Sequence, residues 1–204
     1  MSGGAQKKVA VLASGAGSNL QALIDSEEGK ISLLVCNVPG AGCLERARKA
    51  GIPSVVLDHQ DYASREAYDR ALIDVLQQHR VEVVALAGFM RLVTPAFLKA
   101  FPHSVINVHP ALLPAFPGMH AVQQALDYGV KVSGCTVHFV DEGTDTGPII
   151  AQATVPVHDS DDAATLQARI QEEEHLLFPQ VVWGVAHGRV SLHGRKVTIH
   201  EAAK

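Results

Sequence analysis

Short apolar runs alternate along the chain with longer segments of helical spacing. The apolar runs that we expect to form strands occupy 9–13, 31–38, 55–58, 81–89, 104–108, 135–140 and 149–157. The segments with helical spacing occupy 18–25, 41–50, 62–78, 119–128 and 162–185. Such alternation is typical of a parallel sheet whose strands are joined by crossover helices. The almost wholly apolar run 81–89 is typical of a central strand covered on both faces. The pattern predicts an α/β fold.

No repeat, low-complexity tract or linker interrupts this pattern, so we predict a single domain over residues 1–204. Within it, residues 1–8 are expected to be a flexible lead-in, and residues 188–204 a C-terminal hairpin or tail that turns near His193-Gly194. The polar start differs from a signal peptide, and no apolar run approaches the ~20 residues of a membrane span. We therefore expect a cytoplasmic protein.

Composition narrows the range of partners. The 204 residues are 47% hydrophobic and 19% charged, which is ordinary for a globular protein. A net charge of −4 argues against non-specific binding to nucleic acids or membranes. Cys36, Cys43 and Cys135 form no CxxC pair and no cluster with zinc-ligand spacing, so we expect reduced thiols and no metal. Small molecules are the expected partners, and both a monomer and a homodimer remain open.

The turn Gly-Ala-Gly-Ser-Asn-Leu, residues 15–20, joins the first strand to the first helix. Its glycines permit tight backbone geometry and close approach of a ligand. Free N–H groups at the helix start, with the Ser18 hydroxyl and the Asn19 amide, suit a phosphate. The dinucleotide fingerprint requires a third glycine where this chain has Leu20, so a monophosphate fits better than a nicotinamide cofactor. A ligand-free turn capped by Ser18 is the alternative.

Asn107 and His109 lie at the carboxyl end of a predicted strand, where open α/β sheets bind ligands. Strand alternation puts both side chains on one face. A histidine can carry a proton near neutral pH, and an asparagine amide can stabilise a developing oxyanion. The alternative is that both residues merely satisfy loop carbonyls.

Asp145 lies in the loop 141–148, between two late strands. A loop with two glycines, a proline and three acids is commonly a solvated turn. If the loop folded so that Asp145 reached His109, its carboxylate would fix the orientation of the imidazole and favour its charged form. The loop could also close over a ligand as a gate.

Three co-linear segments resemble signatures of the folate-dependent formyltransferases. Residues 107–114 with 116–118 resemble the signature loop of that family, and residues 137–140 with 145–148 resemble its second signature. Residues 13–20 are similar to the phosphate-binding opening of its glycinamide ribonucleotide branch, and the similarity runs from about residue 9 to 178. The resemblance implies a Rossmann-like fold: an open, mainly parallel twisted sheet with helices on both faces and an active site at the carboxyl ends of the strands.

The resemblance also implies roles for individual residues. Those in the catalytic set are Asn107, His109 and Asp145. Those that contact the ribonucleotide are Gly17, Ser18, Asn19, Arg65 and Glu174. Those that contact the folate are Met90, Arg91, Leu92, Val93 and Asn107. The neighbouring Glu172 and Glu173 leave the register of the glutamate open by a residue, and a solvated helical face is the alternative. Ala111 and Ala115 depart from the family, which commonly has serine and lysine there.

The implied reaction transfers the formyl group of 10-formyltetrahydrofolate, a co-substrate, to the amine of 5-phosphoribosylglycinamide in de novo purine biosynthesis. The amine would attack directly, because the chain has no GxSxG elbow and no recognised nucleophilic cysteine. No metal is implied. Two alternatives are a formyltetrahydrofolate hydrolase, in which water replaces the amine, and a non-catalytic nucleotide-binding α/β module. We expect the hydrolase to carry an additional N-terminal domain.

Overall fold

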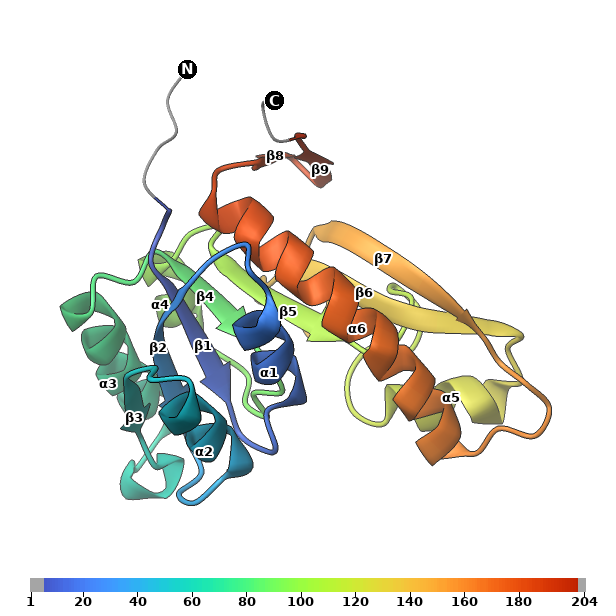
Figure 1. Cartoon of the computed structure of the whole chain (residues 1–204), viewed down its shortest axis with the longest axis horizontal. Helices are drawn as coiled ribbons and strands as arrows, with labels where there is room; N and C mark the ends of the chain where they lie inside the picture. The colour runs from blue at the N-terminus through green and yellow to red at the C-terminus, as the bar shows by residue number, and fades with distance from the viewer. Residues whose placement is uncertain (1–5, 202–204) are drawn as a thin grey trace.

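The computed structural model describes residues 6–201, and Figure 1 shows the order of their elements. The strands are β1 (Val9–Ala13), β2 (Ile31–Cys36), β3 (Ser54–Val56), β4 (Val83–Leu86), β5 (Val105–His109), β6 (Val132–Phe139), β7 (Ile149–Pro156), β8 (Val190–His193) and β9 (Lys196–Ile199). The helices are α1 (Ser18–Asp25), α2 (Gly42–Lys49), α3 (Arg65–Gln78), α4 (Pro95–Ala100), α5 (Ala121–Tyr128) and α6 (Ala163–Ala186), with a 3₁₀ turn η1 (His59–Asp61).

Within this range the main sheet has seven strands in the order β3-β2-β1-β4-β5-β6-β7. The pairings from β3 to β5 are parallel, whereas β6 runs antiparallel to both β5 and β7. The mainly parallel α/β fold predicted from the alternation is thereby confirmed. The strand order reverses at β1 and β4, and open α/β sheets bind ligands at the carboxyl ends of the strands beside such a reversal.

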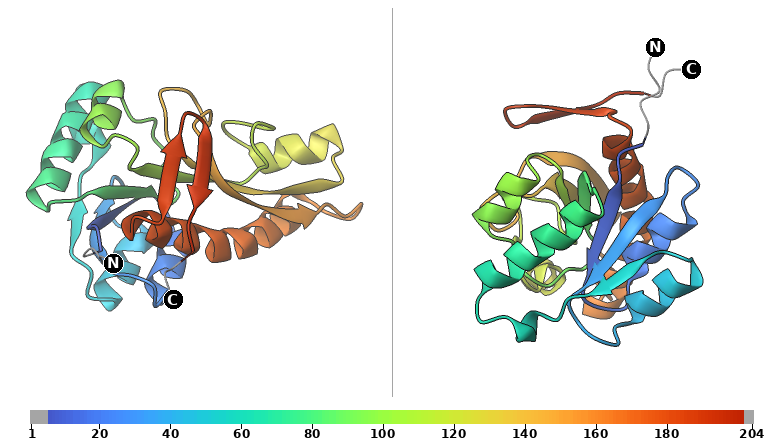
Figure 2. Two further views of the ribbon diagram at one scale, coloured as in Figure 1. Left: turned by 90° about the horizontal axis from the view of Figure 1, so that it is seen from above. Right: turned by 90° about the vertical axis from the view of Figure 1, so that its left-hand side faces the viewer.

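Helices cover both faces of the sheet, as predicted (Figures 1 and 2). Successive residues of β1 alternate between two separate cores because strand side chains point to opposite faces. Val9 and Val11 pack in the core that contains residues of α1, α2 and α6. Ala10 and Leu12 pack in the second core, with residues of α3 and α4.

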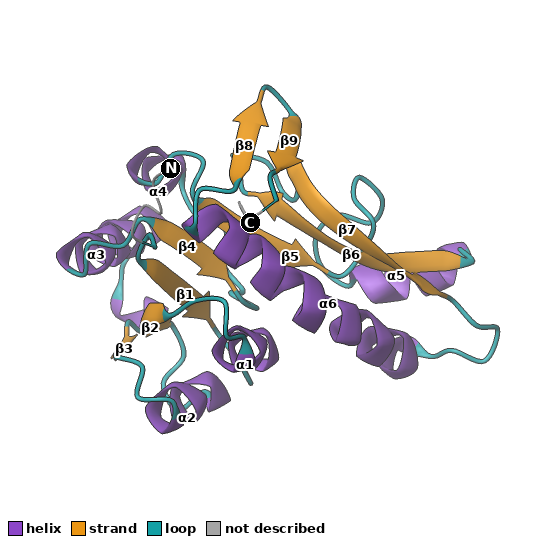
Figure 3. Ribbon diagram, turned by 45° about the horizontal axis from the view of Figure 1, so that its top comes forward, coloured by secondary structure: helices purple, strands orange, loops and turns teal. Residues whose placement is uncertain are grey.

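Helix α6, 24 residues long, crosses the first of these faces (Figure 3). It starts with a capping box in which Asp162 and Thr165 satisfy each other's backbone N–H groups. Near its other end, Trp183 is completely buried. A methyl group placed on Gly29 would collide with the Trp183 indole, so the chain between α1 and β2 lies directly on this ring. None of the described helices is long and apolar enough to cross a membrane.

The structure corrects some predicted elements. Helix α4 was not predicted, although Thr94 caps it and Pro95 occupies its first position, a recognisable helix start. The predicted helix 62–78 begins instead at Arg65, because the Ser64 hydroxyl accepts the Ala67 N–H and caps it there. The strands predicted at 31–38, 55–58 and 81–89 end earlier, at Cys36, Val56 and Leu86, since their last predicted residues turn into the loops at the carboxyl edge of the sheet.

Hydrogen bonds and strand pairing hold the described residues near both ends of the chain. Of the expected lead-in, residues 1–5 lie outside the described residues, and residues 6–8 are hydrogen-bonded: the Lys7 N–H donates to the Ala186 carbonyl at 3.0 Å. Of the expected C-terminal segment, residues 202–204 lie outside the description. Strands β8 and β9 form the predicted hairpin, with His193 opposite Lys196.

Candidate active site

Asn107 and His109 project from β5 into a buried polar cluster. The His109 Nδ1 lies 3.3 Å from Oδ2 of Asp145, and its Nε2 lies 2.8 Å from the Phe116 carbonyl oxygen. His109 is only 5% exposed. Both ring nitrogens therefore face oxygen acceptors, and both contacts are satisfied only when each nitrogen carries a hydrogen.

Asp145 reaches the cluster from the loop between β6 and β7. Its backbone is in the left-handed region, with φ +55°. The Gly118 N–H donates to its Oδ2 at 2.8 Å, and Asn107 Nδ2 lies 3.5 Å from its Oδ1. The structure thus brings together the three residues that the resemblance assigned to catalysis.

The surroundings of Asp145 favour its charged form. Contact with His138, followed by the Gly118 N–H and the charge of His109, lowers the pKa of Asp145 from 3.8 to about 2, against the opposing effect of burial. A carboxylate with such a pKa remains ionised across the physiological range. It is therefore a permanent negative charge beside His109.

His138 on β6 joins the same cluster and was not assigned a role from the sequence. It lies opposite Asn107 in the β5–β6 register and is 1% exposed. Its Nδ1 lies 2.9 Å from the Phe139 carbonyl oxygen, and its Nε2 lies 3.3 Å from Asn107 Nδ2 and 3.6 Å from Asp145 Oδ1. With Nδ1 donating to the carbonyl, Nε2 lies between the Asn107 amide and the Asp145 carboxylate: without a hydrogen it accepts from the amide, and with one it donates to the carboxylate. The signal in the sequence that could have indicated this role is the histidine inside the mainly apolar run 135–140.

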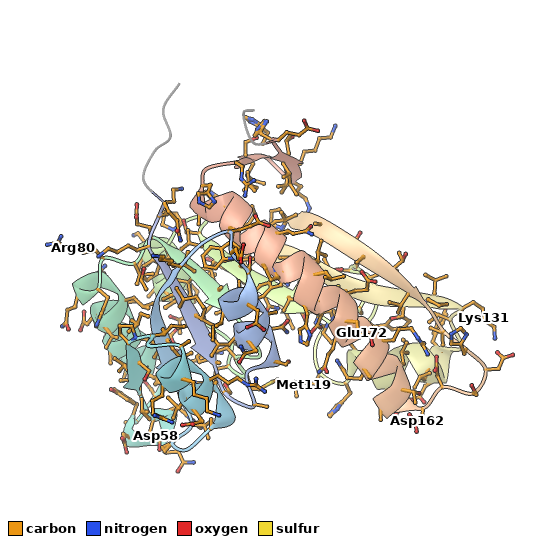
Figure 4. The ribbon with its side chains drawn as sticks, in the orientation of Figure 1. Asp58, Arg80, Met119, Lys131, Asp162 and Glu172 are labelled. Carbon is orange, nitrogen blue, oxygen red and sulfur yellow. The ribbon has the colours of Figure 1, made fainter. Side chains whose placement is uncertain are left out.

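The cluster opens into a cleft of about 830 Å³. Asn107, His109 and Asp145 line this cleft, together with the predicted folate residues Met90, Arg91, Leu92 and Val93. Met90 and Leu92 are 69% and 57% exposed, and Met119, which Figure 4 labels, is 68% exposed, so apolar side chains meet solvent here. Exposed apolar side chains gathered beside polar groups are typical of a ligand site.

The Arg91 side chain packs against an aromatic ring and is not a free surface charge. Its guanidinium carbon lies 4.8 Å from the centroid of the Tyr68 ring on α3, in cation–π geometry. Its Nε is buried and has no hydrogen-bond partner within residues 6–201. The stacking holds the Arg91 side chain against α3.

The turn before α1 lies against α2 and α6. Gly17 has φ +77°, and a side chain there would press on Cβ of Cys43 at 2.8 Å. Asn19 Nδ2 donates to Oε2 of Glu174 at 2.9 Å, and both side chains are buried. Burial raises the pKa of Glu174, and the Asn19 hydrogen bond partly opposes this. Because Glu172 is exposed, the structure favours Glu174 as the glutamate that faces the turn.

A second cleft, of about 520 Å³, lies beside Ser18 and is lined by Arg46 and His175, neither of which was singled out from the sequence. Arg46 Nε donates to the Ala16 carbonyl at 2.8 Å, which ties it to the turn. The His175 Nε2 is buried without a hydrogen-bond partner in the described part of the chain. Burial and the charge of Arg46 lower the pKa of His175. Arg65, in contrast, is exposed at the start of α3 and lines neither cleft.

Comparison with known proteins identifies the family. The sequence pattern described as "Formyl transferase" matches residues 7–182. The chain belongs to this family. It is 46% identical over 181 residues to the phosphoribosylglycinamide formyltransferase of Bacillus subtilis, covering 86% of this chain and 93% of that protein. It is 44% identical over 190 residues to the Escherichia coli protein of the same name, covering 91% and 90%. The resemblance drawn from the three segments is confirmed.

Longer relatives and solved structures agree with this membership. The chain is 48% identical over 190 residues to a trifunctional purine biosynthetic protein of Drosophila melanogaster. This match covers 90% of this chain but only 14% of the length of the fly protein. The crystal structure of glycinamide ribonucleotide transformylase 1 from Symbiobacterium toebii is similar to this fold, with a TM-score of 0.93 and 46% identity over 96% of this chain and 95% of that one. The Rossmann-like formyltransferase fold is therefore the fold of this chain.

Proposed function

We propose that this protein transfers the formyl group of 10-formyltetrahydrofolate to the amine of phosphoribosylglycinamide. The observation that carries the proposal is the contact between His109 Nδ1 and Asp145 Oδ2, 3.3 Å long, at the wall of an 830 Å³ cleft with an apolar rim. The relatives that match almost end to end are named for this reaction.

The proposed chemistry is direct acyl transfer. The amine nitrogen attacks the formyl carbon, the carbonyl oxygen becomes an oxyanion, and the bond to the folate nitrogen then breaks. Asn107 donates a hydrogen bond to the oxyanion, and His109 does so through its Nε2–H, which must first leave the Phe116 carbonyl oxygen that it contacts at 2.8 Å in this structure. Of the two Asn107 contacts, the 3.5 Å contact with Asp145 is the weaker, and we assign that hydrogen to the oxyanion. The proposed reaction uses no metal and no covalent enzyme intermediate.

Proton transfer balances the reaction. The attacking amine loses a proton, and the folate nitrogen gains one as it leaves. We assign this transfer to His109, which gives a ring proton to the leaving folate nitrogen and takes one from the amine, while the ionised carboxylate of Asp145, 3.3 Å from Nδ1, orients the ring and stabilises its charged form. Proton transfer by a positioned side chain typically contributes roughly 10²–10⁴-fold, and alignment of the two substrates contributes more.

The two clefts suit the two substrates. We assign the folate to the 830 Å³ cleft, where Met90 and Leu92 supply apolar contact to a planar ring system. We assign the ribonucleotide phosphate to the turn of Gly17, Ser18 and Asn19, of which Ser18 lines the 520 Å³ cleft together with the cationic Arg46. Free N–H groups at a helix start favour an anion. For Arg65, only the family resemblance supports a contact with the ribonucleotide.

The test is to follow deformylation of 10-formyltetrahydrofolate spectroscopically with purified protein, with and without phosphoribosylglycinamide. We expect deformylation that requires the ribonucleotide and places the formyl group on its amine. Deformylation without the ribonucleotide, with release of formate, would identify a hydrolase instead. Absence of deformylation in both reactions, with the protein folded, would refute the catalytic proposal.

A further inference from the structure

Arg195 connects the C-terminal hairpin to the loop that carries Asp145. It lies in the turn between β8 and β9, where its Nη2 donates to the Thr146 carbonyl at 2.8 Å and approaches the Gly147 carbonyl at 3.5 Å. These are the two residues that follow Asp145. In Figure 3 the hairpin stands beside the end of the sheet from which β7 begins.

The loop depends on such contacts for its conformation. Asp145 has φ +55°, a region that a residue with a side chain rarely occupies without support from its surroundings. Asp141 Oδ1 accepts the N–H of Gly143, before Asp145, at 3.1 Å and the hydroxyl of Thr146, after it, at 2.6 Å. Further along the loop, Arg195 donates to the carbonyls of Thr146 and Gly147. The loop is thus held on both sides of Asp145.

The hairpin is a firm attachment for Arg195. Leu192 and Val197 pack against the core that contains α6, and the His200 N–H donates to the Arg189 carbonyl at 2.7 Å. Arg195 itself is exposed and forms no ion pair within residues 6–201. An exposed arginine in a hairpin turn is ordinarily a solvated charge, whereas the guanidinium here is directed at two backbone carbonyls.

We propose that Arg195 is a positioning residue for Asp145: it holds the loop so that the carboxylate meets His109. This proposal rests on the proposed function, because it gives Asp145 a part in formyl transfer. Arg195 acts through the backbone of the loop, at residues 146 and 147, and contacts neither of the proposed reacting groups. The C-terminal hairpin thereby becomes part of the active-site framework.

A double-mutant cycle tests the route by which Arg195 acts. Arg195→Ala, Arg195→Lys and the neighbouring control Lys196→Ala are compared in the wild-type and Asp145→Asn backgrounds. In the wild-type background we expect Arg195→Ala to lower kcat about fivefold, the weight of one typical hydrogen bond, with the ribonucleotide KM unchanged. We expect Arg195→Lys to recover part of this loss and Lys196→Ala to lose nothing. In the Asp145→Asn background, Arg195→Ala should lower kcat no further.

The same fold loss in both backgrounds, or a loss in Lys196→Ala equal to that in Arg195→Ala, would overturn the proposal. Amide hydrogen exchange provides a second measurement that needs no turnover. Amides in 142–147 should exchange faster in Arg195→Ala than in wild type or Lys196→Ala. Unchanged exchange would refute the anchoring whatever reaction the protein catalyses. Inactive wild-type protein with faster loop exchange in Arg195→Ala would instead count against the proposed function alone.

Discussion

The carboxylate of Asp145 can be neutralised without changing the shape of its side chain, by substitution with asparagine. The pKa of Asp145 is lowered from 3.8 to about 2, and one pKa unit corresponds to about 1.4 kcal/mol. With an allowance for solvent screening, the charge contributes about 1–2 kcal/mol to the free energy of unfolding at pH 7. Asp145→Asn should lose that amount and remain folded.

The sign of the effect gives it a pH signature. Because the pKa of Asp145 is lower in the folded state, its contribution is fully present above the ordinary pKa of 3.8 and is lost as pH falls through about 2. Urea unfolding should therefore show a full stability gap between wild type and Asp145→Asn at pH 7 and a clearly smaller gap at pH 3. An equal gap at both values would mean that the charge is not its cause.

Turnover should respond more strongly than stability. If Asp145 orients His109 for proton transfer, Asp145→Asn should lower kcat by roughly 10²–10⁴-fold, the usual contribution of a positioned proton-transfer group. Glu142→Gln, an exposed neutralisation in the same loop, is the matched control and should change neither kcat nor stability. Near-normal turnover in Asp145→Asn would remove this residue from the mechanism.

Four further substitutions, with Gly15→Ala as a control, test the remaining assignments. Burial raises the pKa of Glu174, so ionisation of this carboxyl opposes folding above its ordinary pKa. In urea titrations, Glu174→Gln should therefore gain stability relative to wild type as pH rises from 4 to 8. The same substitution should increase the ribonucleotide KM. A pH-independent stability difference would contradict that reading. Ser18→Ala and Arg65→Ala should each raise the ribonucleotide KM with unchanged unfolding; if neither does, the phosphate assignment is wrong. Gly147→Ala would drive a methyl group into the Phe139 carbonyl and should cost about 1–3 kcal/mol in the same titrations, whereas Gly15→Ala, which meets open space, should cost much less.

The sequence was most informative where local pattern and burial coincide. The alternation of apolar runs with helical spacing predicted the sheet and its covering helices, because each strand and helix must bury one face or both. Strand alternation also placed Asn107 and His109 side by side. Helix α4 was not predicted because its six residues are too few to show a helical period.

The rest of the site depends on contacts between distant parts of the chain. The composition of the loop around Asp145 favours a solvated turn, and its approach to His109 depends on a left-handed backbone and on the Gly118 N–H from another loop. Arg46 and His175 come from α2 and α6 and meet only because both helices pack beside the first turn. No spacing in the sequence indicates that these two residues line the same cleft.

The burial of Trp183 has a spectroscopic consequence. It is the single tryptophan of the chain, lies in the core beneath Gly29, and is absent from the lining of the 830 Å³ cleft. Its indole N–H is buried without a hydrogen-bond partner within residues 6–201, so its emission should lie at short wavelength in the folded protein and shift to the red on unfolding. Intrinsic fluorescence therefore monitors the integrity of α6 and its core, and a wavelength shift on adding folate would signal a rearrangement of that helix.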